Sequence, residues 1–129
     1  MSDAELKAAL EDWLKKFQEF FVASDTEALA ETLFTADSTM LAPGFEVQHK
    51  REGVARVLSE MKSAGVHNIL FNIHDFGSSS GGELVFQRSS YTMVKADGST
   101  IEVGKYLAVI KKIDGAYFYY SVCFNKDTK

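Results

Sequence analysis

Two Asp-Gly pairs divide the second half of the chain into long segments with strand periodicity. Asp97-Gly98 and Asp114-Gly115 have the composition most typical of two-residue hairpin turns. The segments around them are rich in β-branched and aromatic residues, which favour strands. They cover residues 66–76, 83–95, 100–112 and 116–125, with a Gly/Ser-rich loop at 77–82. Long strands joined by tight turns form an antiparallel meander, and such a sheet twists and curls.

The first half of the chain has helical periodicity instead. Residues 3–22 place apolar side chains at spacings of three and four, which predicts an amphipathic helix ending near Ala23. Ser24 is expected to cap a second helix, with Glu27 as its capping-box partner. The remaining segments are predicted as a strand at 38–42, a short return strand at 45–48 and a third helix at 51–62. Helices followed by a run of strands predict an α+β fold, here one domain over residues 1–129.

The last strand predicts an association surface. Strict alternation gives it two faces, Phe118, Tyr120, Val122 and Phe124 on one and Tyr117, Tyr119, Ser121 and Cys123 on the other. Neither face is polar, so each needs a covering layer. In a chain of 129 residues the helices can cover only one face of the sheet, and a second copy of the chain would cover the other. We therefore expect a homodimer through the convex face of the sheet.

Charge and composition exclude several classes of partner. The net charge of −4 argues against nucleic acid, because phosphate binding needs a basic surface. It also argues against a basic membrane-surface helix, and no apolar run approaches the ~18 residues that span a bilayer. The acidic N-terminal residues do not have the pattern of a signal peptide. Cys123 is the single cysteine, so no disulfide forms within the chain. We expect a cytoplasmic protein without a nucleic-acid or membrane partner.

The many aromatic residues point to a core or cavity lined by large side chains. Arg88 and Lys105 lie in the middle of strands, where each side chain faces either solvent or a cavity, and His74 poses the same question. The residues predicted to bind a ligand are Trp13, Phe17, Met40, His74, Arg88, Tyr91, Lys105 and Tyr119. The histidines have no metal-ligand spacing, and no catalytic set can be assembled from the pattern. We therefore expect neither a metal nor a cofactor.

Several short stretches carry a family resemblance that covers almost the whole chain. They are residues 36–44, which end at Pro43-Gly44, residues 51–55, residues 104–107, the Asp114-Gly115 turn and Phe124-Asn125. With these stretches the chain resembles the nuclear transport factor 2-like superfamily, and within it the SnoaL-like group of small proteins of unknown function. The resemblance implies a cystatin-like cone, in which a curved, mostly antiparallel sheet wraps around N-terminal helices and leaves a pocket. Members include isomerases, cyclases, dehydratases and association modules, so the fold does not define a function.

The chain departs from the family at positions that carry chemistry. The residue matching the general-base Asp of the family's ketosteroid isomerases is Ala42, and the one matching their oxyanion-donating Tyr is Phe17. In the last strand, Tyr117 and Val122 stand where the similar group has Trp and Asp. Isomerisation needs a carboxylate to move a proton and a donor to hold the enolate. The resemblance therefore does not predict isomerase chemistry by that route.

Three functional hypotheses follow. The first is a protein that binds a small, largely apolar molecule in the pocket of the cone. The alternative is an enzyme of the isomerase, cyclase or dehydratase type with a non-standard polar set drawn from Lys105, Arg88, His74 and tyrosines. The third is a homo-oligomerisation module without a ligand. An open apolar cavity favours binding, titratable groups inside the cavity favour an enzyme, and a filled cavity favours the module.

Overall fold

The computed structural model describes residues 2–127, which form three helices and a six-stranded sheet. Its elements in chain order are α1 (Asp3–Val22), α2 (Thr26–Leu33), β1 (Phe34–Leu41), β2 (Gln48–His49), α3 (Lys50–Ser63), β3 (Asn68–Ser78), β4 (Leu84–Val94), β5 (Thr100–Ile113) and β6 (Ala116–Lys126). No helix in this part of the chain is both long enough and apolar enough to span a membrane. The predicted α+β class is confirmed.

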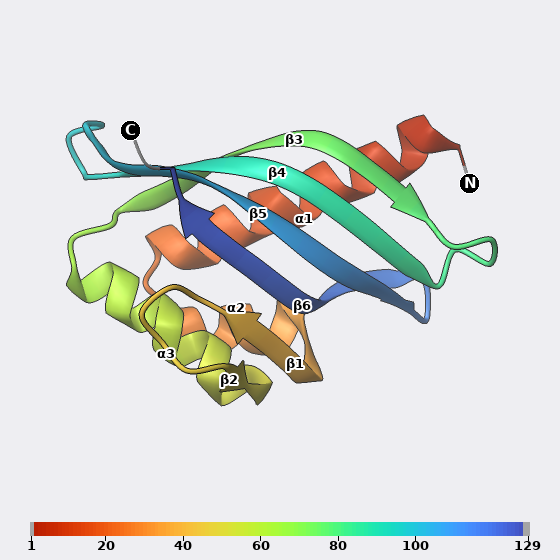
Figure 1. Cartoon of the computed structure of the whole chain (residues 1–129), viewed down its shortest axis with the longest axis horizontal. Coiled ribbons are helices and arrows are strands. Elements are labelled where there is room, and N and C mark those ends of the chain that lie inside the picture. The colour runs from red at the N-terminus through yellow and green to blue at the C-terminus, as the bar shows by residue number, and fades with distance from the viewer. Residues whose placement is uncertain (1, 128–129) are drawn as a thin grey trace.

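The sheet has the order β2-β1-β6-β5-β4-β3. β3 to β6 form the predicted antiparallel meander, and β1 joins it by pairing parallel to β6. The long strands arch over α1, while α2 and α3 lie beside β1 at the other side of the concave surface (Figure 1). The sheet therefore has a concave face covered by helices and a convex face turned away from them.

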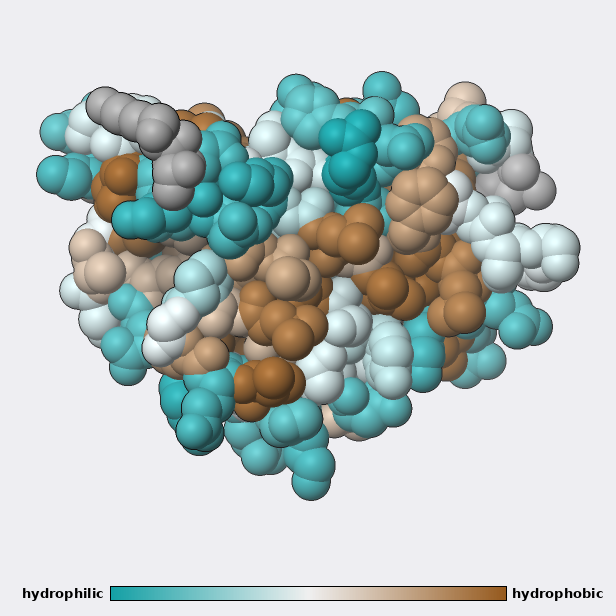
Figure 2. Space-filling model, viewed as in Figure 1, coloured by the Kyte–Doolittle hydropathy of each residue, from teal (hydrophilic) through white to brown (hydrophobic). Residues whose placement is uncertain are grey.

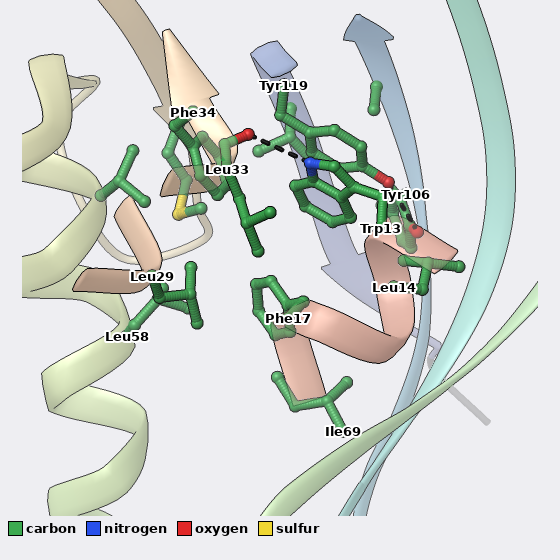
Figure 3. Close-up of a cluster of buried hydrophobic side chains, with 14 of the residues drawn as sticks. Trp13, Leu14, Phe17, Leu29, Leu33, Phe34, Leu58, Ile69, Tyr106 and Tyr119 are labelled. Atoms are coloured by element: carbon green, nitrogen blue, oxygen red, sulfur yellow. Dashed lines mark hydrogen bonds between the residues drawn. The ribbon is translucent and has the colours of Figure 1, made fainter. Parts of the chain in front are cut away.

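Helix α1 is the central element of the core. Ser2 and Glu5 form a capping box at its start, which satisfies backbone donors that have no partner within the helix. Its buried stripe packs into the concave face, and its side chains meet those of α2, β1 and β6 in the cluster drawn in Figure 3. Trp13 Nε1 donates a hydrogen bond of 3.1 Å to the carbonyl oxygen of Leu33, one of the last carbonyls of α2. This bond fixes the position of α1 relative to α2.

The structure corrects three of the predicted element boundaries. Asp25, not Ser24, caps α2, because its side chain accepts a hydrogen bond from the backbone N–H of Ala28. Ser24 instead has a positive φ of 60° and makes the turn between the two helices. β1 begins at Phe34, immediately after α2 and earlier than the predicted residue 38, because pairing with β6 extends the strand. The return strand is only Gln48–His49.

A β-bulge in β6 corrects the predicted faces of the last strand. Val109 pairs with Ser121, whereas the next residue, Ile110, pairs with Tyr119, so Tyr120 is the extra residue. The alternation therefore shifts by one position within the strand. Tyr119 and Val122 are both buried against the helices, although strict alternation had placed them on opposite faces.

Candidate functional site

A cavity lies between α1, α3 and the concave face of the sheet. Its volume is about 60 Å³, and its lining is wholly apolar or aromatic among the described residues. The lining side chains are those of Trp13, Phe17, Phe34, Met40, Leu58, Met61, Ile69, Phe71, Tyr91, Met93, Tyr106, Tyr119, Val122 and Phe124. Drug-sized ligands occupy roughly 300–1,000 Å³. The cavity accommodates a much smaller apolar group unless its walls move.

Stacked aromatic rings form the α1 side of this cavity. The rings of Trp13 and Tyr119 stack with centroids 3.6 Å apart and planes 8° from parallel. Phe17 lies one helical turn from Trp13 and meets Phe71 of β3 edge-on, with centroids 5.4 Å apart. Such pairs contribute about 0.5–1.5 kcal/mol beyond the area they bury. These ring contacts therefore stabilise the α1 wall of the cavity.

The remaining wall is adaptable. Met40, Met61 and Met93 come from three different elements and all line the cavity. Methionine has three rotatable bonds and a polarisable sulfur, so it adjusts to irregular space at little cost. Three lining residues are only partly buried: Met61 of α3, Phe71 of β3 and Phe124 of β6. A ligand larger than the resting cavity would enlarge it by moving these side chains.

A buried polar network lies against the aromatic wall. The hydroxyl oxygens of Tyr106 and Tyr119 are 3.1 Å apart and share a hydrogen bond. The amide of Gln87 donates to Tyr106 over 2.7 Å and to Ser89 over 2.9 Å. Burial raises the pKa of both tyrosine hydroxyls above its ordinary value. Gln87 Oε1 is buried and has no partner among the described residues.

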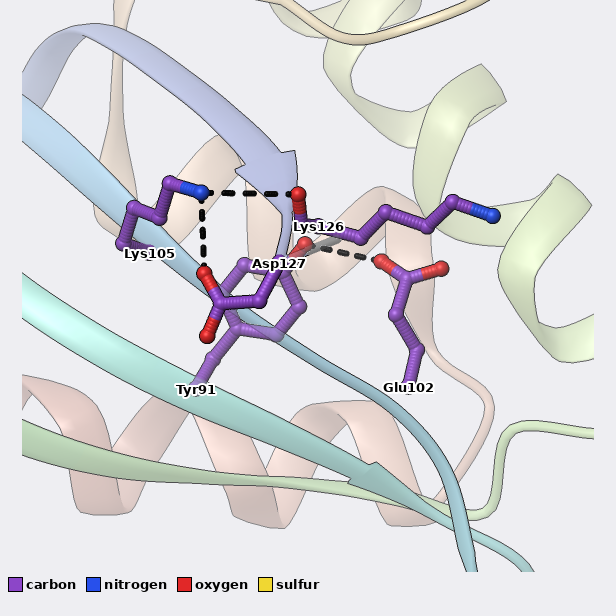
Figure 4. A network of polar contacts seen from close by, with 5 residues as sticks. All are labelled: Tyr91, Glu102, Lys105, Lys126 and Asp127. Atoms are coloured by element: carbon purple, nitrogen blue, oxygen red, sulfur yellow. Dashed lines mark hydrogen bonds and ion pairs between the residues drawn. The ribbon is translucent and has the colours of Figure 1, made fainter. Parts of the chain in front are cut away.

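A second polar contact lies where Tyr91 reaches the end of the sheet. Its ring lines the cavity, and its hydroxyl donates a hydrogen bond of 2.8 Å to Glu102 Oε2 (Figure 4). Burial, reinforced by this carboxylate, raises the pKa of Tyr91. The ring passes directly over Gly104, where a Cβ would collide with the Tyr91 ring and with the backbone oxygen of Asn125. Glycine at position 104 is what allows Tyr91 to span the space between the cavity and Glu102.

Five of the eight predicted site residues line the cavity, and three lie elsewhere. Trp13, Phe17, Met40, Tyr91 and Tyr119 are in the lining. His74, Arg88 and Lys105 are exposed, on the convex side of the sheet. His74 Nε2 lies 2.9 Å from Ser90 Oγ, and Lys105 forms an ion pair of 2.9 Å with Asp127. A charged side chain loses less solvation on that face, which explains why these positions point outward.

Several lining residues were not predicted. They are Phe34, Leu58, Met61, Ile69, Phe71, Met93, Tyr106, Val122 and Phe124. Met93 could have been found, because it shares the strand face of the predicted Tyr91. Val122 could not, because the bulge in β6 changes the alternation. Phe17 and Val122, two of the positions at which the chain departs from the family it resembles, line the cavity. Ala42, a third such position, is buried outside the lining.

The convex face carries a band of exposed hydrophobic side chains. One row across neighbouring strands consists of Leu41, Cys123 and Leu107, and the next contains Val109 and Phe86. Leu107 is 51% exposed and Phe86 43% exposed. Figure 2 shows hydrophobic side chains gathered over the sheet, bordered by hydrophilic ones. Adjacent exposed apolar residues of this kind mark interaction surfaces more often than isolated ones do.

Comparison with known proteins identifies the fold. No protein-family model matches the sequence, and no curated protein matches it. A ketosteroid isomerase-like protein from Erwinia carotovora atroseptica is similar with a TM-score of 0.72 and 20% identity, over 95% of this chain and 96% of that one. An NTF2-like protein with a cystatin-like fold from Novosphingobium aromaticivorans has a TM-score of 0.72 and 13% identity, over 94% and 81% of the two chains.

A third similar structure, from Catenulispora acidiphila, was solved in complex with S-DNPA. Its TM-score is 0.73 at 19% identity, over 97% of this chain and 96% of that one. At these identities the likeness defines the fold and leaves the activity open. The chain has the cystatin-like cone of NTF2-like proteins, and the resemblance seen in the sequence is confirmed at the level of the fold.

Proposed function

We propose that this protein binds a small, largely apolar molecule in the cavity between α1, α3 and the sheet. The observation that carries the proposal is the wholly apolar lining of an unfilled space of about 60 Å³ in the centre of the cone. Close-packed interiors have few voids larger than a water molecule, and an apolar void of this kind costs stability unless something fills it. The three methionines allow the space to adapt to its ligand.

The polar groups near the cavity favour binding over the enzyme alternative. Of the polar set from which that alternative draws, His74, Arg88 and Lys105 do not line the cavity. Only tyrosines from that set do. The tyrosines that do line it have raised pKa values and keep their protons at neutral pH. They are suited to donating hydrogen bonds, and the one described carboxylate that accepts from them, Glu102, lies outside the lining.

The binding proposal is tested by filling the cavity. Val122→Phe places a larger side chain in the lining, and we expect it to abolish binding of toluene followed by NMR chemical-shift titration. Val109→Phe is the matched control. It makes the same valine-to-phenylalanine change on the convex face, away from the cavity, and should leave toluene binding as in the parent protein.

Native mass spectrometry of freshly purified protein, followed by organic extraction, would identify the natural occupant. We expect a bound small molecule in the parent protein and none in Val122→Phe. If toluene shifts no resonance of the cavity lining at saturating concentration, the binding proposal is wrong.

A second proposal concerns self-association. The exposed rows of Leu107, Val109 and Phe86 support a homodimer that packs convex face against convex face, in which each copy covers the other's apolar band. Lys105 is paired with Asp127 at one end of the sheet, and Arg88 lies opposite Leu107 within this face. A stable interface of this kind buries roughly 1,200–2,000 Å² in total.

Sedimentation velocity at micromolar concentration tests the homodimer. We expect the parent protein to sediment as a dimer and Leu107→Arg as a monomer, because a charge facing its symmetry mate would be buried without a partner. Val47→Arg is the control, since Val47 is 45% exposed but lies in the loop before β2. A parent protein that sediments as a monomer would contradict the homodimer proposal.

A further inference from the structure

Glu102 occupies an unusual position beside the cavity. It shares the concave face of the sheet with Gly104 and Tyr106, and its cross-strand partner is the cavity-lining Met93. Directly opposed residues on one face have Cβ atoms about 5 Å apart. The carboxylate is thus a near neighbour of a lining residue, at the end of the cavity where Tyr91 and Phe124 also lie.

The carboxylate of Glu102 is held in place and keeps binding capacity. Tyr91 donates to Oε2, and this hydrogen bond fixes the side chain, which is only partly exposed. A carboxylate can accept several hydrogen bonds, and Oε1 has no partner among residues 2–127. Its neighbour Asp127 is different, because Lys105 already neutralises it over 2.9 Å.

No ion pair within the described part of the chain neutralises Glu102 at the end of the cavity where Tyr91 lies. No described lysine or arginine forms an ion pair with it within 4.0 Å. Lys126 extends on the same side of the sheet in Figure 4, but it is exposed and makes no such contact. An exposed lysine reorients freely, whereas Glu102 is tied to Tyr91.

We propose that the ligand is an amphipathic amine, with an apolar body in the cavity and an ammonium group that donates to Glu102. This inference rests on the proposed binding function and specifies the ligand class. Because the lining is wholly apolar, any polar group of a ligand must emerge at the edge of the cavity, and the fixed acceptor there is Glu102. A charge-assisted hydrogen bond to a carboxylate is the strongest contact available to such a head group.

Three probes with the same ring separate the body of the ligand from its head group. Toluene, benzylamine and benzoate are titrated against the full chain, and affinities are measured from NMR chemical shifts. We expect benzylamine to bind about tenfold more tightly than toluene, and benzoate to bind more weakly than either. Glu102→Gln should remove the preference for the amine while Tyr91 still donates to the amide oxygen. Asp127→Asn is the matched control and should keep the preference, since Asp127 is paired with Lys105.

The outcomes distinguish the two proposals. If toluene binds but benzylamine binds no more tightly, or if Glu102→Gln retains the preference, the amine inference is overturned and the binding function stands. If none of the three probes binds the parent protein, the binding function itself is wrong and the amine inference falls with it. Loss of the amine preference in Glu102→Gln alone supports both.

Discussion

Replacing Trp13 with alanine is expected to lower the free energy of unfolding by about 3–5 kcal/mol. The indole is 5% exposed, stacks on Tyr119, and donates the hydrogen bond to the carbonyl of Leu33. The substitution would leave a large void and a carbonyl without its donor. Urea denaturation followed by circular dichroism measures the effect.

Trp13→Phe separates packing from hydrogen bonding at this position. It keeps a six-membered aromatic ring for Tyr119 and loses the Nε1 donor with the rest of the indole, so we expect a smaller cost than for alanine, about 1–2 kcal/mol. Phe45→Ala is the control for loss of an aromatic ring, since Phe45 is 40% exposed in a loop and should cost less than about 1 kcal/mol. If Trp13→Ala costs no more than Phe45→Ala, α1 is not the centre of the core.

Replacing Gly104 with valine is expected to cost about 3 kcal/mol or more. The first added carbon would lie 2.5 Å from the backbone oxygen of Asn125 and would collide with the ring of Tyr91. The ring would have to move, which breaks its hydrogen bond to Glu102. Thermal and urea unfolding both report this loss.

A matched glycine and a double mutant test the cause. Gly81→Val should cost less than about 1 kcal/mol, because a Cβ at Gly81 meets only the side chain of Glu83, at 3.8 Å and beyond. Tyr91→Ala removes one of the two obstacles at position 104, so the double mutant should lose less stability than the sum of the single changes. Strict additivity would show that Tyr91 does not constrain Gly104.

Much of this fold follows from local sequence signals. The stripe of α1, the two Asp-Gly turns and the length of the last three strands each reflect a local preference that the tertiary structure keeps. The beginning of β1 does not, because it depends on the parallel pairing of Phe34 with Tyr119 of β6. Such a long-range contact leaves no local periodic signal.

The candidate site is less predictable than the fold. Phe17, Met40 and Tyr91 were found because large apolar residues on inward faces meet in the centre of a cone. The positions of Arg88 and Lys105 depend on which face of the sheet the helices cover, and the sequence of a strand that is apolar on both sides does not specify this. Val122 faces the cavity because of the bulge in β6. The extra residue of that bulge is Tyr120, and nothing in the sequence around it marks a bulge.

The most direct test of the apolar cavity is a crystal structure of the protein under xenon pressure. Xenon enters dry apolar cavities and has no polar group to bind elsewhere. We predict a xenon peak enclosed by Phe17, Met40 and Val122, and its absence in crystals of Val122→Phe. A parent structure with the methionine side chains closed over this space, or with xenon only on the convex face, would contradict the account.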